Sequence, residues 1–173
     1  MSRADHPLVG AIRWDAWHGE KGEPGQIVER TLTPQKYRYR LPYFAKVTGD
    51  KVIIRGDSQE IMDQEIAYAK TAGIDYWAFV MYEPGTALRL GLDLYLSSSH
   101  RQGVKFCLIV EQGRFGDRRT FETIGPQIVS LLARPSYQKV LHGRPLLYLG
   151  FISQEKVVIA FRRSNVTTLP VER

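Results

Sequence analysis

The chain has a single cysteine, Cys107, among its 173 residues. One cysteine excludes a disulfide framework within the chain and a zinc site built from several cysteines. Cys107 stands in the apolar run 106–110, so we expect it to be a small buried hydrophobic residue. No spacing of histidine, cysteine and carboxylate residues suggests another metal site, and we predict no cofactor.

Long hydrophobic runs are also missing. The apolar runs 78–81 and 106–110 are far too short to cross a bilayer, so we predict no membrane span. The first seven residues lead into polar sequence without an apolar core, so no secretory signal is visible and the cytoplasm is the default expectation. A glycine-rich phosphate fingerprint and a Gly-x-Ser-x-Gly elbow are absent, which disfavours a dinucleotide-binding fold and serine hydrolase chemistry.

Charge is present but is not gathered in one stripe. The chain has 24 basic and 18 acidic residues, a net charge of +6 and a pI near 9.5. Residues 57–93 contain seven acidic and two basic residues, whereas residues 134–173 contain seven basic and two acidic residues. No binding motif accompanies the basic excess, so we predict no nucleic-acid partner. The proportions of hydrophobic (43%) and charged (24%) residues are typical of a soluble globular protein and exclude a disordered chain.

Apolar segments typical of strands alternate with segments of helical periodicity. Strands are predicted at residues 8–12, 74–82, 104–110 and 146–149. Helices are predicted at residues 58–72, 88–96, 121–132 and 154–163, the third of them interrupted by Gly125 and Pro126. A β-hairpin insertion is predicted around residues 43–56, after a basic, tyrosine-rich stretch at 31–42 that has no clear periodicity. Residues 164–173 form a poorly patterned tail.

This alternation indicates an α/β protein with a parallel sheet covered by helices. The sheet could be part of a (β/α)8 TIM-barrel-like fold, with only about the first four β/α units present, or it could be an open parallel α/β sheet. A full barrel takes about 250 residues and rarely fewer than about 200, so residues 1–173 are expected to form a single partial barrel domain. The outer strands of a half-barrel would be exposed edges, which predicts self-association.

In both architectures, ligands bind at the carboxyl ends of the parallel strands. The residues that follow the predicted strands combine carboxylates, an imidazole, an arginine and aromatic rings: Trp14, Asp15, Trp17, His18, Tyr82, Glu83, Glu111 and Arg114. Acetal cleavage needs a carboxylic acid beside the leaving oxygen and a carboxylate near the anomeric carbon, and sugars stack on aromatic rings. Glu111 and Glu83 are therefore the predicted catalytic residues, and the other six are predicted to bind substrate.

Each of these residues also has a structural interpretation. Pro84 and Gly85 make Glu83 resemble a turn residue, and Asp15 could cap a loop as easily as it could contact a sugar. His18 lies beside a glycine, as solvated loop histidines often do. For Glu111, which directly follows an uninterrupted apolar strand, both interpretations stay open.

Four blocks of sequence resemble a known group of proteins. They are residues 9–18 (VGAIRWDAWH), residues 65–80 (EIAYAKTAGIDYWAFV), residues 94–98 with 104–109 (LYLSS and VKFCLI), and residues 137–148 (YQKVLHGRPLLY). In order and spacing they are similar to the strand and helix blocks in the first half of glycoside hydrolase family 99-like and family 71-like domains, including the WbsX-like group. The similarity extends to about residue 152.

The resemblance implies a (β/α)8 barrel that acts on glycans by a retaining mechanism, using the sugar's own 2-hydroxyl with the help of carboxylates. It implies a glycoside hydrolase, endo-acting on α-mannose-containing glycans, or an incomplete portion of one. A glycosyltransferase of cell-surface polysaccharide synthesis and a non-catalytic glycan-binding module are the alternatives. Glu111 matches the general position of an acidic residue after the third strand, although the loop from Glu111 to Arg114 lacks a second carboxylate.

Overall fold

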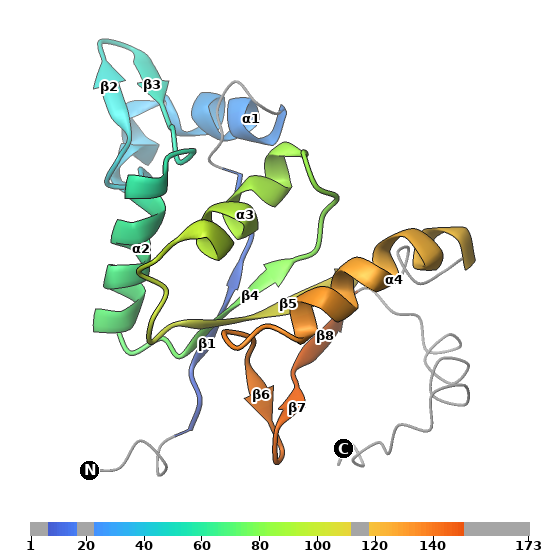
Figure 1. Cartoon of the computed structure of the whole chain (residues 1–173). Helices are drawn as coiled ribbons and strands as arrows, with labels where there is room; N and C mark the ends of the chain where they lie inside the picture. Colours follow the sequence, from blue (N-terminus) through green and yellow to red (C-terminus); the bar gives the residue numbers. More distant parts are fainter. Residues whose placement is uncertain (1–6, 17–22, 112–117, 151–173) are drawn as a thin grey trace, which may run out of the picture.

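The computed structural model describes residues 7–16, 23–111 and 118–150 of the chain. Its centre is a parallel sheet whose four strands follow one another in chain order. The strands are β1 (Gly10–Arg13), β4 (Tyr76–Val80), β5 (Lys105–Glu111) and β8 (Leu147–Gly150) (Figure 1). The predicted α/β class with a parallel sheet is therefore confirmed. In the described part of the chain, β1 and β8 are the two edges of this sheet.

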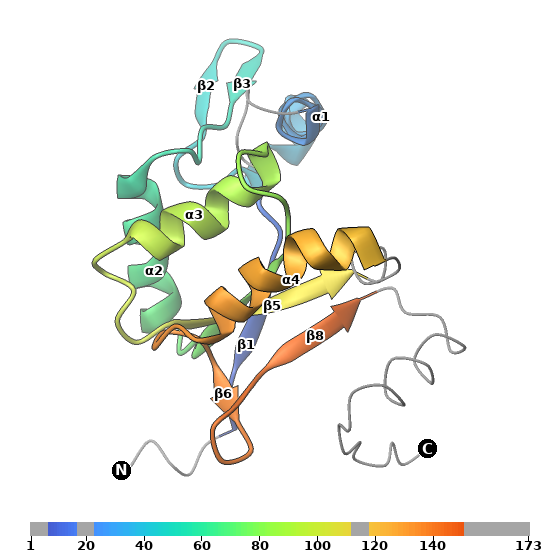
Figure 2. The same ribbon diagram turned by 45° about the vertical axis from the view of Figure 1, so that its right-hand side comes forward.

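Three helices connect the strands. They are α2 (Gln59–Thr71), α3 (Leu90–Ser97), which follows the 3-10 turn η3 (Ala87–Arg89), and α4 (Arg118–Leu132). Right-handed crossovers that add each strand on the same side of the previous one place all connecting helices on one face of a sheet. Both views show α2, α3 and α4 following one another in this order across the sheet (Figures 1 and 2).

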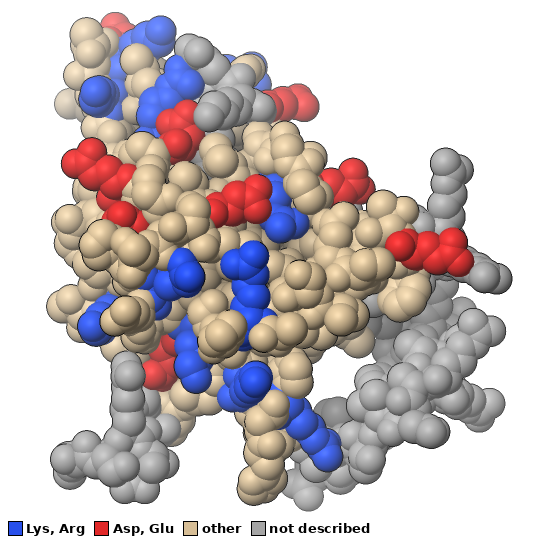
Figure 3. Space-filling view, viewed as in Figure 1, with Lys and Arg blue, Asp and Glu red and all other residues tan. Residues whose placement is uncertain are grey.

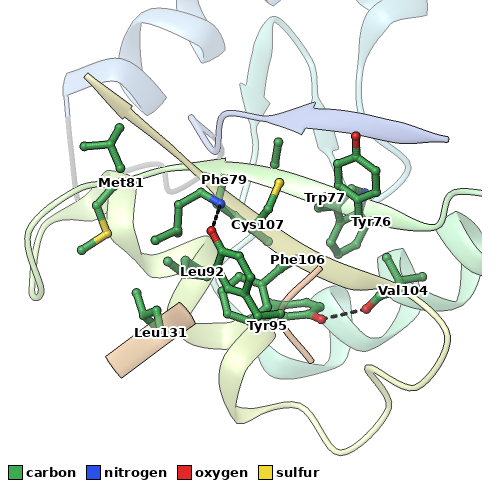
Figure 4. Close-up of a cluster of buried hydrophobic side chains, with 14 of the residues drawn as sticks. Tyr76, Trp77, Phe79, Met81, Leu92, Tyr95, Val104, Phe106, Cys107 and Leu131 are labelled. Atoms are coloured by element: carbon green, nitrogen blue, oxygen red, sulfur yellow. Dashed lines mark hydrogen bonds between the residues drawn. The ribbon is translucent and has the colours of Figure 1, made fainter. Parts of the chain in front are cut away.

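Tyr95 of α3 lies at the centre of the core between sheet and helices (Figure 4). Its ring centroid is 5.5 Å from those of Phe79 and Phe106 and 6.0 Å from that of Trp77, so one helix residue contacts both central strands. Its hydroxyl donates a hydrogen bond of 2.7 Å to the carbonyl oxygen of Val104. This bond satisfies the one polar group of a side chain that is otherwise surrounded by apolar atoms.

A small subdomain lies between β1 and α2, and we call residues 23–56 the insertion. It contains α1 (Glu23–Leu32), the 3-10 helix η2 (Gln35–Arg40) and an antiparallel hairpin of β2 (Lys46–Thr48) and β3 (Lys51–Ile53). Leu32, Val52 and Ile54 form its own apolar core. The hairpin occurs where the sequence predicts one. The insertion follows the carboxyl end of β1, so it stands on that side of the sheet (Figure 1).

The fourth strand is divided into two pieces. Tyr137 bridges to Phe106 of β5, and the chain then leaves the sheet as a short antiparallel hairpin of β6 (Lys139–Val140) and β7 (Arg144–Pro145). It returns at Leu147, which pairs with Leu108. The bridge at Tyr137 and strand β8 therefore both run parallel to β5, and the β6–β7 hairpin lies between them in the chain.

Two helix predictions are wrong. Gly125 and Pro126 do not interrupt α4, which runs unbroken through both residues. Pro126 is exposed, and its missing N–H removes one hydrogen bond of the helix without ending it. The sequence also fails to predict α1, because Pro24 and Gly25 suggest a loop, although proline is well tolerated in the first turn of a helix.

Other predictions are only partly tested. The predicted helix at 154–163 and the tail at 164–173 lie outside the described residues. Within the described ranges, no helix is both long and apolar enough to cross a bilayer. The open parallel sheet is what the described strands form, and closure into a barrel stays a prediction.

We expect Cys107 to be inert in the folded protein. Its side chain is fully buried, and burial raises the pKa of its thiol to about 12. The thiolate fraction at pH 8 is then on the order of 10⁻⁴. A chromogenic disulfide reagent should label Cys107 slowly in buffer and within seconds in denaturant. Complete labelling of the native protein at the denatured rate would contradict this burial.

Candidate functional site

The carboxyl ends of the four strands contain five of the eight residues that the sequence predicts for the site. Trp14 and Asp15 follow β1, Tyr82 and Glu83 follow β4, and Glu111 ends β5. The remaining three, Trp17, His18 and Arg114, lie outside the described residues.

Trp14 and Tyr82 contact each other although 68 residues separate them. The indole Nε1 of Trp14 donates a hydrogen bond of 2.9 Å to the hydroxyl of Tyr82, and about half of the Trp14 side chain is exposed (51%). Two residues predicted to bind substrate thus form one aromatic pair at the carboxyl edge. An exposed ring with a fixed polar tip suits the apolar face and the hydroxyl groups of a sugar.

Arg89 holds the backbone of Tyr82 in place, and the sequence does not predict this role. Its guanidinium is buried and donates from Nη1 to the carbonyl oxygen of Tyr82 at 2.9 Å and from Nε to Oδ1 of Asp93 at 2.8 Å. Because Arg89 belongs to η3, the turn after β4 is tied to the start of the next helix. The position of Tyr82 therefore depends on the guanidinium of Arg89, a residue that does not directly follow a strand and so is not among the predicted site residues.

Glu83 begins a tight turn. Its carbonyl oxygen accepts hydrogen bonds from the backbone N–H and the hydroxyl of Thr86 at 3.3 and 2.8 Å. Gly85 has a φ of 83°, which a type II turn requires at that position. The backbone of Glu83 therefore has the structural role that Pro84 and Gly85 suggest. Its side chain is exposed at the edge, and its catalytic role stays a prediction.

Asp15 is buried in an ion pair rather than displayed at the edge. The Nε of Arg13 lies 2.8 and 3.0 Å from the two carboxylate oxygens of Asp15, and Nη2 lies 2.5 Å from Oε2 of Glu65 on α2. The guanidinium carbon also lies 4.4 Å from the ring centroid of Trp77. Arg13 therefore joins β1 to α2 inside the layer between sheet and helices.

A close approach of α3 seals this ion pair. A Cβ atom at Gly91 would lie 1.9 Å from Oδ2 of Asp15, so only glycine fits there. Burial raises the pKa of the Asp15 carboxyl, and the Arg13 guanidinium limits that rise. The predicted contact between Asp15 and substrate stays untested, but the structure shows a carboxylate already engaged with an arginine.

Arg13 and Glu65 are residues that the strand-end pattern does not select. Strand residues alternate between the two faces, so Arg13 shares with Ala11 the face that packs on the helices. An arginine at such an inward position needs a buried carboxylate partner. That signal, with Asp15 two residues later, could have predicted the ion pair.

Glu111 occupies the opposite face of the sheet. Alternation along β5 places it with Cys107 and Ile109, whereas Phe106 and Leu108 face the helices. It is partly exposed, and its neighbour on β8 is Gly150, which has no side chain to cover it. A carboxylate at the carboxyl end of a parallel strand, on the face away from the described helices, has the position of catalytic groups in barrel enzymes.

Among the described residues, no three histidine, cysteine, aspartate or glutamate side chains are grouped so that they could hold a metal ion. No protein-family model matches this chain, and neither curated proteins nor solved structures include one that is significantly similar to it.

We expect the Asp15–Arg13 ion pair to be essential for stability. Asp15→Asn leaves Arg13 buried with one fewer charge partner and should lower the free energy of unfolding by about 3 kcal/mol. Gly91→Ala should also destabilise, because the added Cβ displaces the same carboxylate. Denaturant unfolding followed by circular dichroism measures both variants. Asp50→Asn, at a fully exposed hairpin residue, is the control, and equal stability of all three variants would contradict the prediction.

Proposed function

We propose that this protein binds glycans at the carboxyl edge of its sheet and hydrolyses their glycosidic bonds. The observation that supports the proposal is the hydrogen-bonded pair of Trp14 and Tyr82 next to the end of β5. The backbone N–H of Met81 donates to the carbonyl oxygen of Ile109 at 2.9 Å, so the segment that leads to Tyr82 runs beside the strand that ends at Glu111. An aromatic sugar platform and a carboxylate therefore belong to adjacent strand ends.

Glu111 is the proposed acid and base of the reaction. In its protonated form it gives its proton to the glycosidic oxygen as the bond to the anomeric carbon breaks, and its carboxylate later takes a proton from the attacking water. Glu83, exposed in the neighbouring turn, is the second proposed carboxylate. It would accept the proton of the substrate's 2-hydroxyl while that oxygen attacks the anomeric carbon, as the sequence resemblance implies. The resemblance also makes α-mannose-containing glycans, cut within the chain, the proposed substrates.

Glycan binding without turnover is the second candidate function. It is favoured by the engagement of Asp15 with Arg13, which leaves that carboxylate no unpaired role at the edge. A binding module needs the aromatic pair but no catalytic carboxylate.

Glu111→Gln should reduce hydrolysis by about 10²- to 10⁴-fold while keeping substrate affinity, since the amide retains the shape of the side chain but cannot transfer the proton. Release of reducing ends from mannan fragments measures the rate, and calorimetric titration with the same fragments measures the affinity. Glu60→Gln, at an exposed position on α2, is the matched control. Unchanged hydrolysis by the Glu111→Gln variant would remove Glu111 from the mechanism, and saturable binding without hydrolysis by the unaltered protein would favour the binding module.

We further propose that the sheet is part of a (β/α)8-type barrel, because each strand lies beside its predecessor and no reversal of strand order occurs among the described strands. Among the described strands, β1 and β8 have no strand beside them on their outer sides, and Ile12 of β1 is 76% exposed. These edges are the proposed surfaces for self-association.

Light scattering should therefore give a mass of at least twice the 19.8 kDa of one chain. Ile12→Lys should shift the protein toward the monomer, because a lysine on an edge strand opposes strand pairing. Val129→Lys, at a residue of α4 that is 66% exposed, is the control away from the edges. A monodisperse monomer at high protein concentration would contradict the proposal.

A further inference from the structure

The part of the insertion that follows Glu29 carries a strong excess of basic residues. Residues 30–55 contain seven lysine and arginine residues and one acidic residue, a formal charge of +6 that equals the net charge of the whole chain. These residues belong to the end of α1, to η2 and to the β2–β3 hairpin. The space-filling view shows blue side chains over this region (Figure 3).

Tyrosine rings hold two of these cations on the surface of η2. The Lys36 ammonium lies 4.9 Å from the ring centroid of Tyr37, and the Arg40 guanidinium lies 5.3 Å from that of Tyr39 and 6.0 Å from that of Tyr37. The Nε of Arg40 also donates to the hydroxyl of Tyr39 at 2.9 Å, which uses one of the five N–H donors of the guanidinium. Tyr37 packs on the core of the insertion, so it anchors both cations to a rigid base.

The hairpin adds two lysines to the same insertion. Val52 points into the core of the insertion, so alternation places Lys51 on the outer face, and the register places Lys46 on that same face. Both lysines are exposed. Arg38 connects the two elements, because its Nη2 donates to the carbonyl oxygen of Gly49 in the hairpin turn at 3.2 Å. We call Lys36, Arg40, Lys46 and Lys51 the cationic surface.

We propose that the cationic surface binds an anionic polysaccharide, one whose sugars bear carboxylate or sulfate groups, and that this polymer is the glycan that reaches the aromatic pair at the carboxyl edge. The inference rests on the proposed glycan function and names the substrate class. Its basis is the complementarity of four exposed cations, two of them held by tyrosine rings, to a polymer of repeating negative charge. The insertion follows β1 directly and stands on the carboxyl side of the sheet, where Trp14 and Tyr82 lie (Figure 1).

A single-stranded nucleic acid is the competing polyanion, and the ring geometry disfavours it. Nucleobases bind to such surfaces by stacking on open aromatic faces. Here a cation lies over each of the rings of Tyr37 and Tyr39, and Tyr37 is also packed against the core, so Tyr39, which is 75% exposed, is the one ring of η2 that is widely open. One open ring offers no succession of stacking platforms for neighbouring bases, whereas the cations suit carboxylate and sulfate groups.

The test compares the affinities of the full chain for four polymers of similar length at one ionic strength: dextran, dextran sulfate, polygalacturonate and single-stranded poly-dT. Dextran and dextran sulfate differ only in charge, while polygalacturonate shows whether carboxylates serve as well as sulfates. The surface variant combines Lys36→Gln, Lys46→Gln and Lys51→Gln. The matched control combines Lys70→Gln, Lys105→Gln and Lys139→Gln, three exposed lysines away from the insertion. Thermal unfolding checks that both variants remain folded.

We expect dextran sulfate or polygalacturonate, or both, to bind at least tenfold more tightly than dextran and poly-dT. The surface variant should lose about tenfold in that affinity, because three contacts of the strength of exposed ion pairs multiply to about this factor. The control variant should stay within about twofold of the unaltered protein. Equal losses in both variants would indicate diffuse charge attraction and overturn the proposal. Poly-dT binding as tight as that of the anionic glycans, with the same loss in the surface variant, would also overturn it.

The same materials separate this inference from the proposed function. The Glu111→Gln variant should bind the anionic polymer as tightly as the unaltered protein. Tight, surface-dependent binding without hydrolysis of any glycan would uphold the inference and refute the hydrolase. Hydrolysis of neutral mannan at a rate unaffected by the surface variant, without binding of the anionic polymers, would uphold the hydrolase and refute the inference.

Discussion

The buried guanidinium of Arg13 is the constraint on which the rest of the structure depends. A charge removed from water must be paired, and here Asp15, Glu65 and the ring of Trp77 surround it. These partners come from the segment after β1, from α2 and from β4. The Arg13 side chain therefore contacts both α2 and β4, and it joins the edge strand β1 to these two elements.

The positions of the candidate site residues Trp14 and Tyr82 depend on buried arginines. Trp14 lies in the sequence between Arg13 and Asp15, which form a buried ion pair. Because separating that pair would leave a buried charge uncompensated, the backbone on both sides of Trp14 is held in place. On the neighbouring strand, Arg89 performs a similar task for Tyr82. Two arginines outside the proposed site thus hold the two rings that are proposed to bind the glycan, so residues on loops gain their precise positions from the packed elements beneath them.

The sequence predicts the strands well because buried parallel strands are continuous apolar runs, as in residues 76–80 and 106–110. The insertion is harder to predict, because the first turn of α1 contains Pro24 and Gly25 and its stability comes from packing on the hairpin. The carboxyl-edge rule brings Trp14 and Tyr82 together correctly. It selects Asp15 for the same reason, but only the inward register of Arg13 reveals that Asp15 is buried. Pairing of side chains across elements is a tertiary property, which single-strand patterns do not contain.

The insertion also affects the order of folding. Gly10 pairs with Tyr76, 66 residues away, whereas Tyr76 pairs with Lys105 and Leu108 with Leu147 over 29 and 39 residues. Closing the longer loop costs only about 0.7 kcal/mol more than closing the 29-residue loop, but distant pairings form more slowly. The insertion has its own core, so it can fold independently of the sheet. We expect the edge strand β1 to be the last to join the sheet, because its pairing spans the longest stretch of chain, and the contact between Trp14 and Tyr82 would form at this final step.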